Sequence, residues 1–473
     1  MKNKTMKKMK KLLLIISFFL YFSPVVANTI DSSFVVSLAL PILSISTIDG
    51  AMPTCEFVWP PEGEYGISTT NKTKVYGRII LSYQGNTIFD SGSYKKNEGG
   101  MSLRIRGNTS AYYSVKKPYK IKLEVKADML GRGNADYADK EWLLIDQGND
   151  NLNALIGLKI NEMMGLGEWT PAYMYVNLIF NGEYHGIYML IESIKRNIHC
   201  RINIDKSGYM FERDAYWWNE DIYFSTLSNK KYTFKYPEKD KVTEEKIDYL
   251  KQTVNDMEKS IDEGNYQHTI NVESFARWLM AHDILGSSDA AGSNIFLTKK
   301  DSTANSKVEM SVLWDFDSNF RNTDKWSSIH TNEKVFYFPQ LLNSKNTLFI
   351  ETYKNVWKEM SDSIFDTMVD FLKEFRTSEL AYLLQKSRMY DGEKWNFPPD
   401  SVNQNIDIAL QWFENRKKWL SDNINATEVP DHIINIKNTK ANQFTYTLSG
   451  QRILSEKTVS GIYIRNGKKY FVR

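Results

Sequence analysis

The side chains best suited to chemistry lie in residues 285–320, where polar loops flank two strand-like runs. The runs, residues 294–298 and 310–314, are expected to form a β-hairpin. Carboxylate and amide oxygens are hard ligands, which suit a Mg²⁺ ion that bridges phosphate groups and keeps several waters. The pattern therefore predicts a divalent-metal site at the mouth of the hairpin. Its candidate residues are Asp289, Asn294, Asp315 and Asp317.

The order of these elements suits phosphoryl transfer. In protein kinases a loop Asp orients the accepting hydroxyl, while an Asn and a later Asp hold the metal ions. Two plainer interpretations remain open at this point. Asp and Asn are ordinary turn residues. Asp315-x-Asp317-x-Asn319 also resembles the beginning of a calcium loop, although Phe320 stands where such a loop needs Gly.

Strand-like segments fill much of residues 28–240 and must position the rest of the site. Leu103–Arg106 alternates in polarity and leads into a small polar turn. Lys116–Leu123 is expected to be a strand with Lys120 and Lys122 on one face and apolar residues on the other. Further strands are expected over residues 38–47, 173–180, 185–192, 208–212 and 232–236, with a hairpin turn at Asn181-Gly182.

Apolar residues three and four positions apart predict helices through most of residues 241–428, which the hairpin interrupts. An earlier helix is expected over Asn149–Met164, after an Asn/Asp-rich start suited to capping. Residues 429–473 are typical of a small β module. The expected class is α+β, with a sheet-rich part, a helical part and this module. The later helices are expected over residues 242–262, 272–284, 351–376, 378–389 and 402–424.

The first residues predict export. Met1–Ala27 has six lysines, then an apolar run too short to span a membrane, then small residues before a cleavage site. Without this segment the formal charge changes from +3 to −3, with 54 basic against 57 acidic side chains. The composition therefore gives no support for nucleic-acid binding, and no transmembrane span is expected in the mature chain.

Cysteine and histidine usage offers little chemistry. Cys55 and Cys200 are the two cysteines. In an oxidising compartment they could form one disulfide, and two isolated thiols are the open alternative. The six histidines are scattered, without the spacing of a zinc site.

Several segments together resemble the spore coat protein H (CotH) kinase family. The first three are Arg106–Ser110, Lys116–Leu123 and Asn181–Glu192. Asp289-x₄-Asn294 and Trp314–Asp317 resemble that family's catalytic and metal-binding elements, and Trp412–Leu420 is similar to its last helix. The resemblance spans residues 37 to 425 and implies an atypical, protein-kinase-like fold with a sheet-rich N-lobe and a helical C-lobe. It also implies phosphate transfer from ATP to secreted or coat proteins.

The resemblance assigns roles to particular residues. Asp289 is implied to be the catalytic-loop Asp, and Asn294, Asp315 and Asp317 the metal-binding group. The implied phosphate clamp is one of Arg106, Lys120 and Lys122, with Glu162 as a candidate ion-pair partner. The implied cofactors are ATP and Mg²⁺ or Mn²⁺, and the implied partner is a secreted or surface protein. The C-terminal module resembles one that exported Gram-negative proteins use for secretion or surface sorting, so the periplasm or cell surface is the expected location.

Some positions depart from the family pattern. Ser318-Asn319-Phe320 stands where the family usually has Gly, and Asn153-Ala154-Leu155 replaces an Arg-Asn pair. A catalytically inactive kinase-like scaffold, acting as a surface adhesion or glycan- or protein-binding protein, is therefore a second hypothesis. Tyr216-Trp217-Trp218 could stack on sugars, and core packing explains the same residues. A hydrolase has little support, because no G-x-S-x-G or H-E-x-x-H motif is present.

Overall fold

The computed structural model describes residues 38–146, 152–287, 292–320, 336–396, 398–399 and 401–426, and four short strands beyond residue 444. The chain divides into two compact units, residues 1–429 and 430–473, and each is described by itself. The expected signal segment and Asp289 lie outside the described residues. In the described part of the chain, no helix is both long and apolar enough to cross a membrane.

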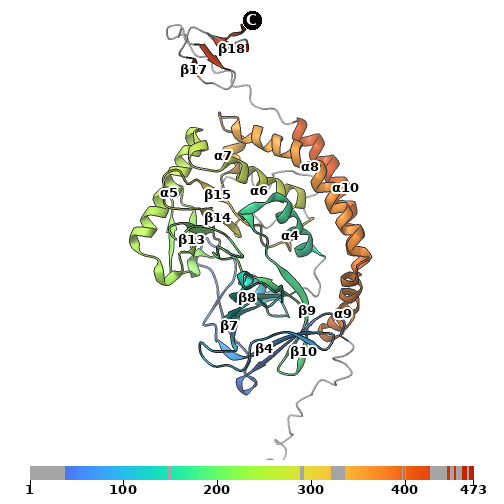
Figure 1. Cartoon of the computed structure of the whole chain (residues 1–473). Coiled ribbons are helices and arrows are strands. Elements are labelled where there is room, and N and C mark those ends of the chain that lie inside the picture. Colours follow the sequence, from blue (N-terminus) through green and yellow to red (C-terminus); the bar gives the residue numbers. More distant parts are fainter. Residues whose placement is uncertain are drawn as a thin grey trace, which may run out of the picture. The chain divides into compact units, whose positions relative to one another are not determined.

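An eight-stranded sheet forms the N-terminal part of the first unit (Figure 1). Its order is β1-β9-β10-β8-β7-β6-β4-β5, and β1 also pairs with β4, so the sheet closes on itself. Closure gives β1 and β4 partners on both sides, whereas β5 pairs with β4 alone among the described strands. All pairs are antiparallel except β1 with β9. The strands are β1 (Ile42–Thr47), β4 (Val75–Tyr83), β5 (Asn86–Asp90), β6 (Met101–Ile105), β7 (Tyr119–Ala127), β8 (Asp139–Asp146), β9 (Tyr173–Phe180) and β10 (Glu183–Glu192).

Local sequence accounts for several features of this sheet. Asn181 and Gly182 have φ values of 49° and 81°, as a two-residue hairpin turn between β9 and β10 requires. In β7 buried apolar residues alternate with more exposed lysines, as the alternation in the sequence predicts. The apolar faces enclose a core that includes the fully buried Trp142 and Tyr188.

A second, five-stranded sheet has the order β12-β13-β11-β14-β15. The sequence grouped residues 208–212 and 232–236 with the first sheet, but these segments pair with the hairpin instead. The physical reason is burial, since all five residues of β14 are buried and a buried strand needs partners on both edges. The strands are β11 (Tyr209–Arg213), β12 (Tyr223–Ser225), β13 (Lys231–Tyr236), β14 (Ile295–Lys299) and β15 (Val308–Met310).

Helices make up most of the remaining first unit, close to the predicted positions. The side chains of Thr243, Asn271 and Ser378 cap three of them by accepting backbone N–H groups. The helices are α3 (Thr109–Tyr113), α4 (Asn153–Met164), α5 (Glu244–Glu263), α6 (Val272–Leu285), α7 (Phe338–Leu342), α8 (Leu348–Arg376), α9 (Glu379–Trp395) and α10 (Val402–Ala426).

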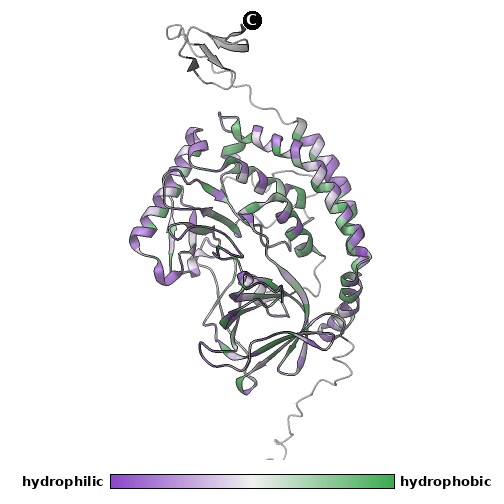
Figure 2. Cartoon of the chain, viewed as in Figure 1, coloured by the Kyte–Doolittle hydropathy of each residue, from purple (hydrophilic) through white to green (hydrophobic). Residues whose placement is uncertain are grey.

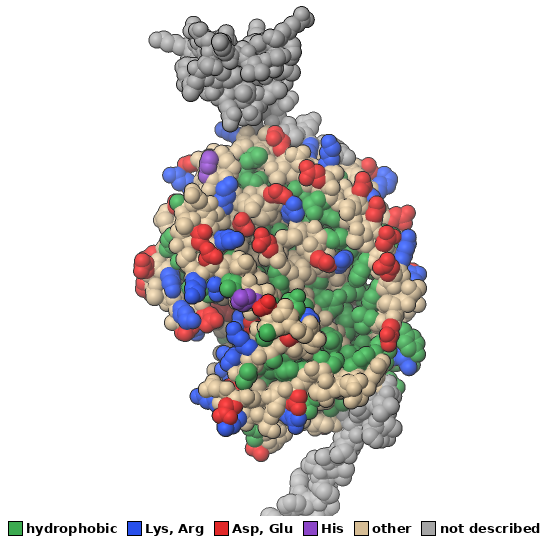
Figure 3. Space-filling model, in the orientation of Figure 1, with side chains coloured by type: hydrophobic (Ala, Val, Ile, Leu, Met, Phe, Trp, Pro, Cys, Tyr) green, Lys and Arg blue, Asp and Glu red, His purple; other side chains and the backbone are tan. Residues whose placement is uncertain are grey.

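Helix α6 is the centre of the helical core. The Trp278 ring stacks on Phe338 at 5.6 Å, and the Trp412 indole N–H donates to the Ile284 carbonyl at 2.9 Å. The outer helices α8 and α10 have mixed polarity along their length, with apolar positions packed on this core (Figure 2). Their basic and acidic side chains are interspersed on the face shown in Figure 3.

The other described elements of the first unit are short. A two-stranded sheet pairs β2 (Glu56–Val58) with β3 (Ser68–Thr70). Cys55 and Cys200 are free thiols, half-buried and buried respectively. The 3₁₀ helices are η1 (Ile48–Gly50), η2 (Ala135–Tyr137), η3 (Leu166–Glu168), η4 (Trp217–Asn219), η5 (Lys239–Lys241) and η6 (Tyr266–His268).

The second unit contains a four-stranded antiparallel sheet in the order β17-β16-β18-β19. Its strands are β16 (Thr445–Thr447), β17 (Arg452–Ile453), β18 (Gly461–Arg465) and β19 (Lys468–Val472). Strands were expected in this region, whereas its predicted sorting role stays a prediction.

Candidate active site

The centre of the candidate site is a contact between Asn294 and Asp315. Asn294 directly precedes β14, and its Nδ2 donates to Asp315 Oδ2 at 2.8 Å. Both residues have left-handed backbone conformations, with φ values of 61° and 66°. Such conformations are uncommon outside Gly and are maintained where surrounding contacts fix them, frequently at functional sites. The hairpin therefore joins the predicted amide and carboxylate ligands, as their spacing suggested.

Arg106, from the first sheet, lies near the Asn294–Asp315 pair. It follows β6, and its backbone N–H donates to the Pro118 carbonyl at 3.0 Å, which fixes the turn. Burial lowers the pKa of the Arg106 guanidinium, while the nearby Asp315 carboxylate opposes that effect. The side chain is half-buried and has neither a hydrogen bond nor an ion pair with any described residue. Arg106 thus presents a cation beside the predicted metal ligand.

Phe316 anchors the segment that carries Asp315. Its ring is buried against α4, because a β-carbon at Gly157 would lie 2.1 Å from the ring. The Asn153 amide donates to the Asp317 carbonyl at 3.4 Å, and the Asn319 amide donates to the Asn153 carbonyl at 3.3 Å. The asparagines at positions where the sequence departs from its family pattern therefore dock α4 onto this segment.

Glu212 was missed by sequence reasoning. It lies near the end of β11 with a buried carboxylate, and its Oε1 accepts the Asn294 backbone N–H at 2.9 Å and the Ser293 hydroxyl at 3.3 Å. Lys235 of β13 forms an ion pair with Glu212 at 2.7 Å and lies 3.8 Å from Asp214. Burial alone would lower the pKa of Lys235, but these two carboxylates outweigh burial and raise it.

No local sequence signal pointed to Glu212 and Lys235. They are 23 positions apart, on strands that were expected to belong to the other sheet. Strand β11 pairs with both β13 and β14, which brings Glu212 to Asn294 and Lys235 to Glu212.

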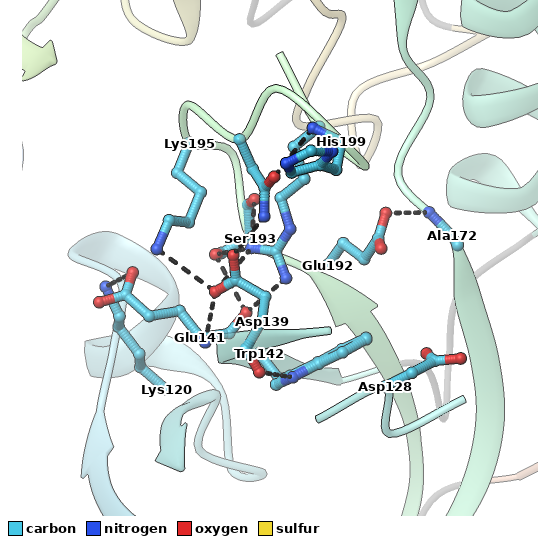
Figure 4. Close-up of polar contacts among 12 residues, drawn as sticks. Lys120, Asp128, Asp139, Glu141, Trp142, Ala172, Glu192, Ser193, Lys195 and His199 are labelled. Carbon is cyan, nitrogen blue, oxygen red and sulfur yellow. Dashed lines mark hydrogen bonds and ion pairs between the residues drawn. The ribbon is translucent and has the colours of Figure 1, made fainter. Parts of the chain in front are cut away.

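Lys120 and Lys122 are on the same face of β7 but have different surroundings. Lys120 is half-buried and forms an ion pair with Glu141 of β8 at 2.9 Å (Figure 4). Burial lowers the pKa of Lys120, and Glu141 opposes this effect. Lys122 is exposed. Of the two strand lysines, Lys120 therefore has the fixed position that a phosphate clamp requires.

Arg104 is a second residue that the sequence assignment omitted. It is half-buried on β6 opposite Lys120, and its charge is close enough to lower the pKa of Arg106, Lys120 and Lys72. In the described part of the chain it has no hydrogen bond or ion pair. The alternation in Leu103–Arg106 was the available signal, because it places Arg104 and Arg106 two positions apart.

Two predicted site residues, Glu162 and Asp317, make no side-chain contact with this group among the described residues. Glu162 is exposed and pairs with Lys159 of its own helix at 2.9 Å, so the predicted pairing with the basic strand is not found. Lys120 pairs with Glu141 instead, because an adjacent strand supplies a nearer carboxylate. Asp317 is exposed, and its backbone carbonyl accepts the Asn153 amide. Asp289 lies outside the described residues.

A network of buried charges lies beside Lys120 at the end of β10 (Figure 4). Asp139 accepts hydrogen bonds from Lys195 at 3.3 Å and from the Asn197 amide at 3.1 Å. Arg201 donates to the Ser193 hydroxyl at 2.6 Å. These contacts fix the segment that connects the first sheet to the second sheet. The candidate site has residues from both sheets.

The aromatic residues considered for sugar stacking have packing roles. The Trp217 ring lies 4.7 Å from Tyr223, and Lys231 lies over Trp217 at 4.9 Å. The Tyr216 hydroxyl forms a hydrogen bond with Thr109, next to the Arg106 turn. Asn219 donates to the Ser68 hydroxyl at 2.7 Å. The cluster therefore connects the second sheet to the β2–β3 segment and the first sheet.

Lys116, from the basic motif, is buried away from this group. Its ammonium contacts Asp146 at 2.7 Å, Asp391 at 2.9 Å and the Ile187 carbonyl at 2.8 Å. A β-carbon at Gly186 would lie 1.8 Å from the Asp391 carboxylate, and φ there is +93°, so Gly is required. This part of the motif joins the first sheet to α9.

The donor set fits a divalent cation bound together with phosphate. Asp315 offers a carboxylate, and Asn294 offers an amide oxygen that accepts no hydrogen bond from any described residue. No group of three or more His, Cys, Asp and Glu residues suited to metal occurs in the described ranges. Two protein oxygens agree with Mg²⁺, which takes one or two carboxylates, substrate phosphates and water.

Comparison with known proteins identifies the family. The CotH kinase protein family matches residues 103–420, more than half of the chain. The chain therefore belongs to the CotH kinase family, which confirms the resemblance. No curated protein matches the chain.

One similar solved structure is the complex of the HipA and HipB toxin–antitoxin proteins of Shewanella oneidensis MR-1 with operator DNA. It is 12% identical, over 81% of this chain and 76% of that chain. Its TM-score of 0.28 is too low to inform fold or function.

Proposed function

We propose that this chain is an ATP-dependent protein kinase, which uses Mg²⁺ or Mn²⁺ to transfer phosphate to a hydroxyl of a secreted or surface protein. Its fold is a kinase-like pair of lobes, with the closed first sheet as N-lobe and the second sheet with its helices as C-lobe. The observation that carries the proposal is the convergence of Arg106, Asn294 and Asp315 in a CotH family chain.

The described residues supply the binding part of this function. Asp315 and Asn294 would hold a divalent cation through oxygen atoms. Such a cation neutralises phosphate charge. Arg104, Arg106 and Lys120 provide cations on neighbouring strands and would bind phosphate oxygens. The Glu141 carboxylate holds Lys120 in place.

Transfer requires an acceptor hydroxyl in line with the γ-phosphorus. The hydroxyl oxygen forms a bond to that phosphorus while the bond to the β–γ bridging oxygen breaks, releasing ADP. Asp289 is proposed to orient the hydroxyl and to pass its proton to solvent. Positioning and electrostatic stabilisation supply most of the rate in this chemistry.

We also propose export to the periplasm or cell surface. The support is the lysine-rich and apolar pattern of Met1–Ala27, together with the C-terminal β module. Cell fractionation with and without residues 1–27 tests export, because deletion of the signal should retain the protein in the cytoplasm.

Labelling with γ-labelled ATP tests the transfer. Wild type should label a protein acceptor in the presence of Mg²⁺ or Mn²⁺, and Asp289→Ala and Asp315→Ala should not. Asp301→Ala is the matched control, because Asp301 lies in the turn at the opposite end of the same hairpin and accepts from Thr303. Equal labelling by all four proteins, or none by wild type, would exclude the catalytic role. A wild type that is stabilised by ATP but transfers nothing would indicate an inactive scaffold.

A further inference from the structure

The carboxylate of Glu212 is buried and paired with a lysine. Its side chain is 7% exposed, and its charge is balanced by Lys235 at 2.7 Å. A buried ion pair contributes little net stability, because desolvation of both charges offsets their attraction. Net folding stability therefore does not explain the Glu212–Lys235 pair. The other contacts of Glu212 indicate its role.

Those contacts lead to the candidate metal ligand. Glu212 Oε1 accepts the Asn294 backbone N–H at 2.9 Å, and the Asn294 side-chain Nδ2 donates to Asp315 at 2.8 Å. The left-handed φ of 61° at Asn294 is thus held from both its backbone and its side chain. A charged acceptor makes the backbone hydrogen bond short and strong.

The same contacts determine which atom of Asn294 faces a ligand. Its backbone N–H is bound by Glu212, and its side-chain nitrogen is bound by Asp315. The remaining polar side-chain atom is Oδ1, an oxygen acceptor of the type that a divalent cation takes. A rotation of the Asn294 backbone would move this oxygen relative to Asp315.

Lys235 determines the position of the Glu212 carboxylate. Its ammonium is fixed by two acids, Glu212 and Asp214, and Asp214 in turn accepts from the Thr233 hydroxyl at 2.9 Å. Thr233 is the residue opposite Glu212 on β13, so the arrangement is built into the pairing of two strands. Rigid strands hold ligand-supporting residues more precisely than loops do.

We propose that Glu212, fixed by Lys235, is the positioning residue that orients Asn294 Oδ1 for divalent-cation binding. Glu212 acts through Asn294 and does not touch the reacting atoms. This inference rests on the proposed function, since it assigns a support to that same metal site. Residues that orient metal ligands affect metal affinity or activity by about 10–100-fold.

Glu212→Gln tests the proposal, because it keeps an oxygen for the Asn294 N–H and removes the charge. Glu309→Gln is the matched control, since Glu309 belongs to the same sheet and accepts from the Asn271 amide at 3.2 Å. Binding of Mn²⁺ in the presence of a non-hydrolysable ATP analogue should weaken about 10-fold in Glu212→Gln. The control should bind like wild type. Thermal melting of each variant measures the folded fraction.

Lys235 supplies an independent test. Lys235→Met should also weaken Mn²⁺ binding. Lys235→Arg should bind Mn²⁺ like wild type, because an arginine can pair with both acids. In activity assays the Mg²⁺ concentration for half-maximal rate should rise and kcat should fall, while KM for the acceptor stays constant. A purely structural role would lower the melting temperature without this selective change.

The outcomes separate the two proposals. Wild-type Mn²⁺ affinity in folded Glu212→Gln would overturn the positioning role, whatever the activity. A wild type without phosphate transfer, whose Mn²⁺ binding still weakens in Glu212→Gln, would overturn the kinase reaction and support the positioning role.

Discussion

Two groups of basic residues in this chain, one around Lys116 and one around Arg106, have different surroundings. Around Lys116 the ammonium is 3% exposed and contacts two carboxylates and a carbonyl. Around Arg106 the guanidinium is half-buried beside Asp315, and neither Arg106 nor Arg104 has a hydrogen bond or ion pair with a described residue. The Lys116 group is internally satisfied, whereas the Arg106 group has spare binding capacity.

The difference teaches how to divide a run of basic residues into structural and functional parts. A buried cation whose donors are all occupied contributes to the connection between elements. Cations that lack acceptors, next to oxygen ligands in strained conformations, have spare capacity for an anionic ligand. Sequence spacing did not distinguish Lys116 from Lys120, because both belong to one run of residues.

The largest expected effect is loss of stability in Lys116→Met. Asp391 is 0% exposed and would remain as a buried, uncompensated charge. Removal of one partner of a buried ion pair costs about 3–5 kcal/mol. Urea unfolding should show this decrease, with Lys117→Met as control because Lys117 contacts backbone carbonyls near the surface. Unchanged stability would remove the distinction between the two groups.

Asp315→Ala should lose activity and keep its stability, the opposite of the result expected for Lys116→Met. Its loss removes a carboxylate from the candidate metal site and leaves the apolar anchor Phe316 in place. Phosphate transfer should fall about 10²–10³-fold, the range found when one electrostatic contact to a developing charge is removed. Melting temperature and transfer rate, measured on the same preparation, separate this variant from Lys116→Met. A variant that unfolds instead of losing activity would make the Arg106 group structural.

Acidification should partly restore Lys116→Met. Burial raises the pKa of the Asp391 carboxyl above its ordinary value, against the attraction of Lys116. A raised folded pKa means that the folded state binds the proton more tightly, so stability is lost as the pH rises through that pKa. Without Lys116 the raised pKa should rise further, so lowering the pH should protonate a growing fraction of Asp391 and relieve the buried charge. Unfolding curves at several pH values, compared with Lys116→Met/Asp391→Asn, should show that the double variant lacks this recovery.

A smaller effect is expected for Arg104→Gln. The half-buried guanidinium lies beside Arg106 and Lys120 and would contribute one phosphate contact. We expect a loss of about tenfold in ATP affinity, equivalent to about 1.4 kcal/mol. Lys122→Gln is the control on the same sheet face, since Lys122 is exposed. Equal losses of ATP affinity in the two variants would indicate that the positive charges of the sheet face act together, rather than through a specific contact of Arg104.

The smallest effect is expected for Glu162→Gln. The exposed pair with Lys159 is a helical i,i+3 contact, and such pairs contribute about 0.2–0.5 kcal/mol. Activity and melting temperature should both stay near wild type. A large loss of activity would restore the role that the family resemblance implied for Glu162.

The sequence by itself determined the features that local chemistry specifies. Asn181-Gly182 specified a hairpin, the lysine alternation in β7 specified its exposed face, and the spacing of Asn294 and Asp315 placed both residues at one hairpin. These signals are local because a turn, a pleat or a strand pair involves residues that are close along the chain.

Only the tertiary structure decided the partners of these residues. Glu212 and Lys235 reach Asn294 because β11 pairs with both β13 and β14, and Lys116 meets Asp391 across 275 positions of sequence. Glu141, rather than Glu162, pairs with Lys120 because the two strands are neighbours. Such choices depend on which surfaces the whole chain buries together, and no short segment contains that information.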